Sequence, residues 1–267
     1  ATIQTGPLPE LPMPDTASLQ SVLASWREWP LAISAPPKVL GPVPGGRTNR
    51  NVKIAVPGLS GPLILRLNNR RSEALGINRT AEAQILYSAA KAKIAPEPIY
   101  QDPSHRFSIL PFIDARVWQA KDFSNPLQRQ RLLRLLRSVR ELNPATEKRS
   151  YYNYLAHYMQ QLQSADVVSV DLAQQWAAFT PRLQAFDQAP WPAELTHHDL
   201  IPENILDTGN RLYLIDWEYA AIGHADIDLW CIDTALVHEP FIHELAQWTN
   251  ELWERVLALP CHLSPDE

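Results

Sequence analysis

Two short segments of the sequence carry polar side chains at a spacing that could do chemistry. Residues 196–206 read THHDLIPENIL and hold Asp199 and Asn204, and residues 212–220 read LYLIDWEYA, with Asp216 at the end of an apolar run. The D-x-x-x-x-N spacing lets a loop turn back, so that both side chains face one side. A carboxylate can take a proton from an alcohol, and carboxylate and amide oxygens are ligands that Mg²⁺ prefers. Transfer of a phosphoryl group from ATP needs such a base and such metal ligands.

Adjacent histidines in the first segment raise a competing interpretation, a metal site built on imidazoles. His197 and His198 would need further ligands, such as His224, His238 or His243. Neighbouring side chains of an extended segment point to opposite sides, however, so the adjacent pair is poorly placed to bind one ion. The sequence also has no HExxH, HxH or paired Cys-His ligand spacing. Phosphoryl transfer is therefore the favoured chemistry.

The first part of the chain has the alternation and turn residues of a small sheet. Short apolar runs separated by PGGRT and PGLSG predict strands, and a helical period follows before two more strands. The predicted strands are 38–43, 51–56, 62–67, 97–100 and 106–113, and the predicted helix is 77–93.

From about residue 115 the pattern becomes helical. Apolar residues recur at helical spacing over long stretches, while the segment that holds Asn204 and Asp216 resembles two short strands joined by a turn. The predicted helices are 126–142, 150–164 and 170–187, together with the tail from 226 to 258. We therefore expect an extended leader at 1–14, a nucleotide-binding lobe at 15–112 and a larger catalytic and substrate-binding lobe at 113–267.

Composition excludes several other classes of protein. The chain has 267 residues and a net charge of −5, so no basic field would attract nucleic acid. No apolar run approaches the roughly 18–20 residues that span a bilayer. The first residues have neither the basic nor the apolar region of a signal peptide. The two cysteines form no disulfide framework, so a cytoplasmic location is expected.

The two polar segments resemble the catalytic core of the aminoglycoside phosphotransferase/choline kinase superfamily, whose pattern is H-x-D-x-x-x-x-N followed by I-D-[WF]-E-Y. The residues of these motifs match those of bacterial choline kinases best, with thiamine kinases next. Upstream, GGRTNRNVKI at 45–54 is similar to the family's glycine turn, and residues 63–82 are similar to its L-R-[LI] strand and I-N-R-x-x-E helix. The resemblance implies an α+β, protein-kinase-like fold with a small β-rich N-terminal lobe and a larger, mostly helical C-terminal lobe.

The resemblance also implies roles, with ATP and Mg²⁺ as cofactors. Asp199 corresponds to the catalytic aspartate, and Asn204 and Asp216 correspond to the metal ligands. Arg66 would touch the phosphates, with Glu82 as its partner, although the two could also be a simple surface ion pair. The implied ATP-binding residues are Gly45, Gly46, Thr48, Asn49, Arg66, Glu82, Pro111 and Ile113. A kinase-like binding module without turnover is the alternative from another class, which the filled catalytic positions disfavour.

The acceptor is predicted less directly than the reaction. A small cationic alcohol of the choline or ethanolamine type ranks first, before thiamine, an aminoglycoside and an uncharged sugar. A cation favours aromatic faces and a nearby acid. The candidates for such a site are Trp230, Trp248, Glu218 and Asp233. The helical spacing of the tryptophans is also typical of a core, and Ala235 stands where choline kinases tend to have an acid. No nucleic-acid or membrane partner is expected.

Overall fold

The computed structural model describes residues 16–260, which form two compact units. Among the described residues, the smaller unit consists of 16–70 with Ile99–Phe112, and the larger of Arg71–Pro98 with 113–260. The predicted leader at 1–14 lies outside the described residues. Arg71–Pro98 groups with the larger unit, whereas the expected nucleotide-binding lobe at 15–112 includes these residues.

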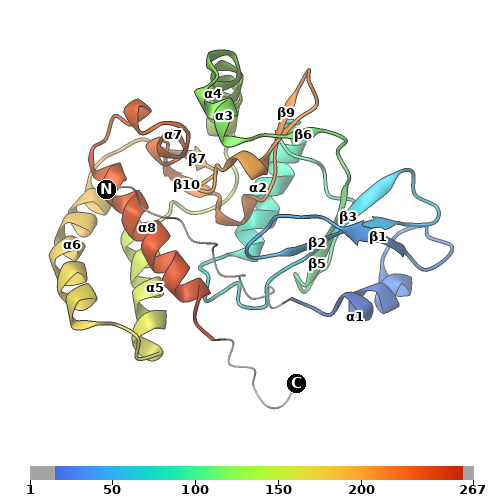
Figure 1. The fold of residues 1–267 in the computed structure, drawn as a ribbon, viewed down its shortest axis with the longest axis horizontal. Coiled ribbons are helices and arrows are strands. Elements are labelled where there is room, and N and C mark those ends of the chain that lie inside the picture. Colours follow the sequence, from blue (N-terminus) through green and yellow to red (C-terminus); the bar gives the residue numbers. More distant parts are fainter. Residues whose placement is uncertain (1–15, 261–267) are drawn as a thin grey trace. The chain divides into compact units, whose positions relative to one another are not determined.

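The smaller unit is built on an antiparallel five-stranded sheet (Figure 1). Alternate residues of the central strands are buried on one face, as the period of two predicts. The short helix α1 (Leu19–Ala24) begins after Ser18, whose hydroxyl accepts from the N–H of Ser21. In spatial order the strands are β1 (Lys38–Pro42), β2 (Arg50–Ala55), β3 (Pro62–Leu67), β5 (Phe107–Pro111) and β4 (Tyr100–Gln101).

The larger unit combines helices with two small sheets. The helices are α2 (Arg79–Lys91), α3 (Ala120–Ser124), α4 (Pro126–Arg140), α5 (Tyr151–Ser164), α6 (Val170–Gln188), α7 (Asp226–Ile232) and α8 (Phe241–Leu257). The sheets are β6 (Arg116–Val117) with β8 (Ile205–Asp207) and β9 (Leu212–Leu214), and β7 (Ala193–Thr196) with β10 (Ala221–His224). The predicted α+β fold is confirmed, while β6, β7 and β10 were not predicted.

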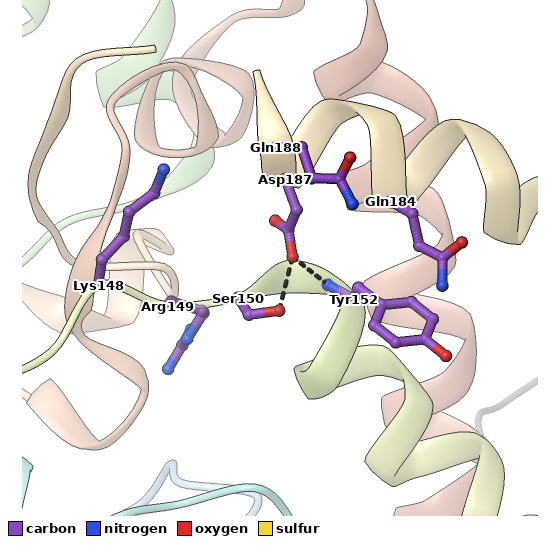
Figure 2. Close-up of a pocket in the computed structure, with 7 residues that line it drawn as sticks. All are labelled: Lys148, Arg149, Ser150, Tyr152, Gln184, Asp187 and Gln188. Atoms are coloured by element: carbon purple, nitrogen blue, oxygen red, sulfur yellow. Dashed lines mark hydrogen bonds between the residues drawn. The ribbon is translucent and has the colours of Figure 1, made fainter. Parts of the chain in front are cut away.

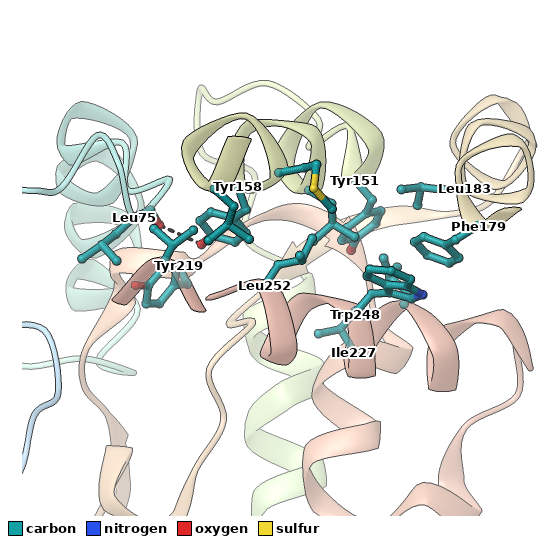
Figure 3. Close-up of a cluster of buried hydrophobic side chains, with 14 of the residues drawn as sticks. Leu75, Tyr151, Tyr158, Phe179, Leu183, Tyr219, Ile227, Trp248 and Leu252 are labelled. Atoms are coloured by element: carbon teal, nitrogen blue, oxygen red, sulfur yellow. Dashed lines mark hydrogen bonds between the residues drawn. The ribbon is translucent and has the colours of Figure 1, made fainter. Parts of the chain in front are cut away.

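Helices α5, α6 and α8 share an apolar core with many aromatic rings (Figure 3). Trp248 of α8 stacks on Phe179 of α6, with ring centroids 5.0 Å apart and ring planes at 12°. Removing a buried aromatic ring of this kind costs about 3–5 kcal/mol of stability. This core includes Tyr151 of α5, whose hydroxyl lies 3.0 Å from Nε2 of His198.

Helix α2 belongs to a second core of the same unit. Ile85 and Leu86 are buried there with Leu132 of α4 and Leu214 of β9. The N–H of Leu214 also donates to the carbonyl of Ile94, at 2.9 Å, just after the helix. These contacts explain why α2 groups with the larger unit.

The segment that leads into α2 is tied to helices α5 and α8. Arg71 donates to the carbonyls of Val256 (2.8 Å) and Leu259 (3.0 Å) at the end of α8. The hydroxyl of Tyr158 donates to the carbonyl of Leu75 at 2.8 Å (Figure 3). Cations favour the carboxyl end of a helix, so Arg71 also stabilises the last turn of α8.

Of the two cysteines, Cys231 is described and its thiol is free, while Cys261 lies outside the described residues. No helix in the described part of the chain is long and apolar enough to cross a membrane.

Candidate active site

The polar loop begins where strand β7 ends, and a buried carboxylate from α7 holds its backbone. Asp228 accepts from the N–H groups of His197 and His198, both at 3.0 Å. Burial raises the pKa of Asp228, while the two N–H donors favour its charged form. The loop is therefore anchored immediately before Asp199.

His198 lies at the end of a chain of hydrogen bonds. Its Nδ1 lies 3.1 Å from the carbonyl of Thr196, which can only accept, so Nδ1 carries the proton. The hydroxyl of Tyr151 then donates to Nε2 (3.0 Å) and accepts from the N–H of His224 (2.8 Å). A Cβ added to Gly223 would lie 2.6 Å from the His198 ring, so glycine is required there. Burial lowers the pKa of His198 well below its usual value, which keeps the ring neutral.

His197 is also committed to the protein rather than to an ion. Its Nε2 donates to the carbonyl of Ile215 at 3.1 Å, and its ring packs 4.9 Å from that of Trp217. Burial lowers its pKa as well. Within residues 16–260 no group of three or more His, Cys, Asp or Glu side chains could hold a metal ion. The structure thus argues against the histidine metal site.

Asp199 and Asn204 are joined directly, as their spacing predicts. The Nδ2 of Asn204 donates to the backbone carbonyl of Asp199 at 2.9 Å and to its Oδ2 at 3.0 Å. The turn η2 (Pro202–Asn204) folds the chain back, and the side chain of Asn204 is buried. Because its amide nitrogen is used in this way, the amide oxygen is the atom that Asn204 can offer to a cation.

Asp216 joins the same cluster through the backbone. The N–H of Ile215 donates to the carbonyl of Asn204 at 3.0 Å. The residue before Asp216 is therefore hydrogen-bonded to Asn204. Asp216 has φ 63° and ψ 64°, a left-handed conformation that is costly for a residue with a Cβ. Such conformations cluster at functional sites. One carboxylate and one amide oxygen fit Mg²⁺, which typically takes one or two carboxylates beside phosphate and water.

The predicted nucleotide turn belongs to the smaller unit. Gly45 and Gly46 have φ of 97° and 87°, and a Cβ on Gly46 would lie 3.0 Å from the carbonyl oxygen of Asn49. Thr48 and Asn49 are buried, and both bond to Asn69 just after β3. The turn is thus fixed, with glycine where the backbone requires it.

The other predicted nucleotide residues are divided between the two units. Arg66 lies on β3 opposite Ser108, and Pro111 ends β5. Glu82 lies on α2, and Ile113 begins the second segment of the larger unit. Contact of these residues with a nucleotide, and the pairing of Arg66 with Glu82, stay predictions.

A buried ion cluster connects α2 to the turn after Asp216. The Nη1 of Arg79 lies 2.7 Å from an oxygen of Glu82 and 2.9 Å from an oxygen of Glu218. All three side chains are at most 8% exposed. Both carboxylates therefore share one guanidinium, which fixes α2 against η3 (Trp217–Tyr219).

Glu218 also lines a cavity of about 480 Å³, which we call the Glu218 cavity. Its other walls come from the start of α2, the segment before α5, the first turn of α5 and the start of β10. The lining residues are Gly76, Asn78, Thr80, Ala81, Gln84, Ile85, Ala145, Thr146, Glu147, Arg149, Ser150, Asn153, Tyr154, Glu218, Ala220 and Ala221. Its volume is in the range of small-molecule sites.

The other candidates for acceptor binding lie elsewhere. Trp248 belongs to the core, and Trp230 packs against that core. Asp233 pairs with Arg129 at 2.8 Å and caps the turn η4 (Thr234–Leu236). Neither tryptophan is among the residues that line the Glu218 cavity, nor is Asp233.

Two cavity residues were missed in the sequence, Arg149 and Tyr154. Burial raises the pKa of Tyr154, the guanidinium of Arg149 lowers it, and the charges of Asp199 and Glu218 raise it further. The two carboxylates therefore act on one tyrosine. No motif surrounds Arg149 or Tyr154, and only the fold brings them to the site.

The chain is similar to known proteins in sequence and in fold. Residues 39–259 match the model of the phosphotransferase enzyme family. A curated protein, the LicA homolog of Mycoplasma capricolum subsp. capricolum, is 42% identical over 40 residues, which are 15% of this chain and 17% of that protein. The chain thus spans less than a fifth of the length of this relative.

Two solved structures share the fold at low identity. LicA in complex with AMP has a TM-score of 0.62 and 17% identity, and the alignment covers 91% of this chain and 82% of that one. A choline/ethanolamine kinase family protein from Mesorhizobium loti has a TM-score of 0.57 and 21% identity, covering 89% and 81%.

Proposed function

Because the chain belongs to the phosphotransferase enzyme family, we propose that it transfers the γ-phosphoryl group of ATP to a hydroxyl group of a small cationic alcohol of the choline or ethanolamine type. The residues around Asp199 would carry the chemistry, with Mg²⁺ bound together with the nucleotide.

In this proposal Asp199 orients the acceptor hydroxyl and accepts its proton. The acceptor oxygen forms a bond to the γ-phosphorus while the bond from that phosphorus to the bridging oxygen of ADP breaks, and ADP leaves. Asn204 and Asp216 would hold Mg²⁺, which neutralises charge on the phosphates. Gly45, Gly46, Thr48, Asn49 and Arg66 would contact the nucleotide, with Glu82, Pro111 and Ile113 as further candidates.

The observation that carries the proposal is the double hydrogen bond from Asn204 to Asp199. It would keep the proposed base and a proposed metal ligand side by side. The left-handed backbone at Asp216 adds a second carboxylate to the same cluster.

A cationic acceptor is supported by an acid and an aromatic ring that line one cavity. Glu218 lines the cavity together with Tyr154, and a carboxylate beside an aromatic face suits an ammonium group. The names of the solved relatives, which refer to choline and ethanolamine, agree with this choice. We infer no nucleic-acid or membrane partner.

The test is ADP release from Mg²⁺-ATP with choline, ethanolamine, thiamine, kanamycin or simple sugars as separate acceptors. An amino alcohol should raise ADP release above the reaction without acceptor. Turnover with an uncharged sugar alone would refute the cation argument but keep the kinase assignment. Failure to bind Mg²⁺-ATP at millimolar concentration would refute both.

Asp199→Asn should lower kcat by about 10²–10⁴ because the general base is lost. Nucleotide binding, measured by calorimetry, should be largely retained, since the base acts on the acceptor. Glu203→Gln is the matched control, because Glu203 is an exposed acid of the same loop. Near-full turnover by Asp199→Asn would show that the base is a different residue.

A further inference from the structure

Arg149 lines two neighbouring cavities of the larger unit. One is the Glu218 cavity, and the other, of about 410 Å³, is lined by residues at the start of α5 and by Asp187 near the end of α6 (Figure 2). Asp187 accepts from the hydroxyl of Ser150 (2.6 Å) and the N–H of Tyr152 (2.9 Å), so its carboxylate is committed to the helix. Lys148 points away from Arg149 (Figure 2), and its Nζ lies 3.5 Å from the ring centre of Trp191.

The guanidinium of Arg149 has an aromatic partner but no carboxylate. Its Cζ lies 4.3 Å from the ring centre of Tyr154. Within residues 16–260 it makes no side-chain hydrogen bond or ion pair, in contrast with Arg79, which binds two carboxylates. A guanidinium presents a planar set of donors that suits a carboxylate or a phosphate. The wall of the Glu218 cavity thus includes a cation able to bind an anion.

The same wall also carries negative charge. Glu218 and Glu147 line the cavity, and Asp199 acts electrostatically on Tyr154, the ring beneath Arg149. Positive and negative groups on one wall are complementary to a ligand that carries both signs. The volume of about 480 Å³ is within the range of small-molecule sites.

We propose that the Glu218 cavity binds an amino alcohol that also bears an acidic group, a carboxylate or a phosphate, and that Arg149 binds this acidic group. The inference rests on the proposed function and narrows its acceptor. The ammonium would lie toward Glu218, the hydroxyl toward Asp199 and the anion on the guanidinium above Tyr154. Arg149 would then determine specificity without taking part in the transfer itself.

The experiment compares kcat/KM for ethanolamine, which lacks an acid, with values for acid-bearing amino alcohols. L-serine and L-homoserine supply a carboxylate, and sn-glycero-3-phosphoethanolamine supplies a phosphate, so the arms distinguish the two anions. At least one acid-bearing acceptor should exceed ethanolamine by about tenfold to a hundredfold, the range expected for a charge-assisted hydrogen bond.

Variants then assign this preference to one residue. Arg149→Gln should lower kcat/KM for the acid-bearing acceptors until it is within about twofold of the value for ethanolamine, while Arg149→Lys should restore part of the preference. Arg211→Gln is the matched control, because Arg211 also lies over an aromatic ring, that of Tyr213, but outside the cavity. Lys148→Gln tests the neighbouring cavity and should have no effect. Circular dichroism confirms that each variant is folded.

Equal kcat/KM for ethanolamine and all acid-bearing acceptors would overturn this inference and leave the kinase proposal intact. So would a preference that survives Arg149→Gln. If no acceptor supports turnover, the proposed function fails. Calorimetry then measures separately whether the same compounds bind to the Glu218 cavity. Binding of an acid-bearing compound that Arg149→Gln abolishes would support the site, and its absence would overturn it.

Discussion

At the scale of single residues, the polar cluster around Asp199 depends on two unusual backbone positions. His198 and Asp216 have φ of 64° and 63°. His198 immediately precedes Asp199, and Asp216 itself carries a carboxylate of the site. The loops after β7 and β9 bring these positions together, and Asp228 and Asn204 fix the backbone around them. The strain at Asp216 is therefore sustained by its neighbours and directs its side chain from a rigid position.

Asp216→Ala should raise the dissociation constant of ATP at least tenfold in the presence of Mg²⁺, because a proposed metal ligand is lost. Calorimetric titration with and without EDTA measures the metal-dependent part. Asp166→Ala is the matched control, since Asp166 also has a positive φ, of 54°, and both variants place alanine in a left-handed position. Equal nucleotide affinity of Asp216→Ala and the unmodified protein would remove Asp216 from the metal site.

The sequence predicted the residues of the cluster but not their surroundings. The spacing of Asp199 and Asn204 is a local property, and the hydrogen bond between them follows from it. Tyr151 and Arg149 lie nearly fifty residues before the loop, so no local pattern indicates that they approach it. Trp248 was a candidate for acceptor binding but belongs to the core. Helical spacing identifies an apolar face but does not distinguish a core from the wall of a binding site.

At the scale of elements, buried ion pairs connect segments that are distant in the chain. Arg79 joins α2 to the turn after Asp216, and Arg131 of α4 holds Asp207 of β8 through two hydrogen bonds of 2.7 and 2.8 Å. Buried pairs of this kind give little net stability when intact, but breaking one is costly.

Arg79→Gln should lower the free energy of unfolding by about 3–5 kcal/mol, because two buried carboxylates lose their guanidinium. Urea denaturation followed by circular dichroism measures the change. The control is Arg182→Gln, which breaks the solvent-exposed pair with Glu244 and should cost no more than about 1 kcal/mol. Similar losses in the two variants would show that the Arg79 cluster is not effectively buried.

Asp207 makes stability depend on acid pH. The hydrogen bonds from Arg131 lower its pKa to about 2, below the value of about 3.9 for an unfolded chain. The carboxylate therefore stabilises the fold above about pH 4, and this contribution, up to about 2 kcal/mol, is lost as the pH falls toward 2. In urea titrations, the difference in unfolding free energy between the unmodified protein and Asp207→Asn should shrink over this range. A constant difference from pH 5 to pH 2 would contradict the assignment.

Long elements with a clear period were predicted well, and short ones were not. Helix α4 starts at Pro126, and its leucines at helical spacing mark the buried face. Strands β7 and β10 are four residues each and pair across an intervening 24 residues, from 197 to 220. Neither has an alternating pattern or a hairpin turn. Each forms a strand because it pairs with the other, which its own sequence does not indicate.

At the scale of the whole molecule, the chain passes between the units three times, after residues 70, 98 and 112. The sequence pattern indicated a change of character only at the last of these points. Helix α2 follows the strands of the smaller unit in sequence, so its packing against α4 and β9 could not be read from local periodicity.

Ile85→Ala should destabilise the larger unit by about 2–5 kcal/mol, because Ile85 of α2 is fully buried there. Hydrogen exchange followed by mass spectrometry should show lost protection in α4 and β9, with β2 and β3 unaffected. Ile109→Ala is the reciprocal control, since Ile109 is equally buried in the sheet of the smaller unit. Lost protection in β2 and β3 on Ile85→Ala would contradict the division.

The division has a consequence for the order in which the protein is made. The ribosome releases Arg71–Pro98 before Ile99–Phe112, so the first piece of the larger unit emerges before the strands that complete the smaller sheet. Leu214, one of the packing partners of α2, is synthesised 116 residues after Pro98. At about 5–20 residues per second, roughly 6–23 s pass before that partner exists. During this time the apolar face of α2 is incompletely covered on the nascent chain, and misfolding or binding of a chaperone competes with native assembly.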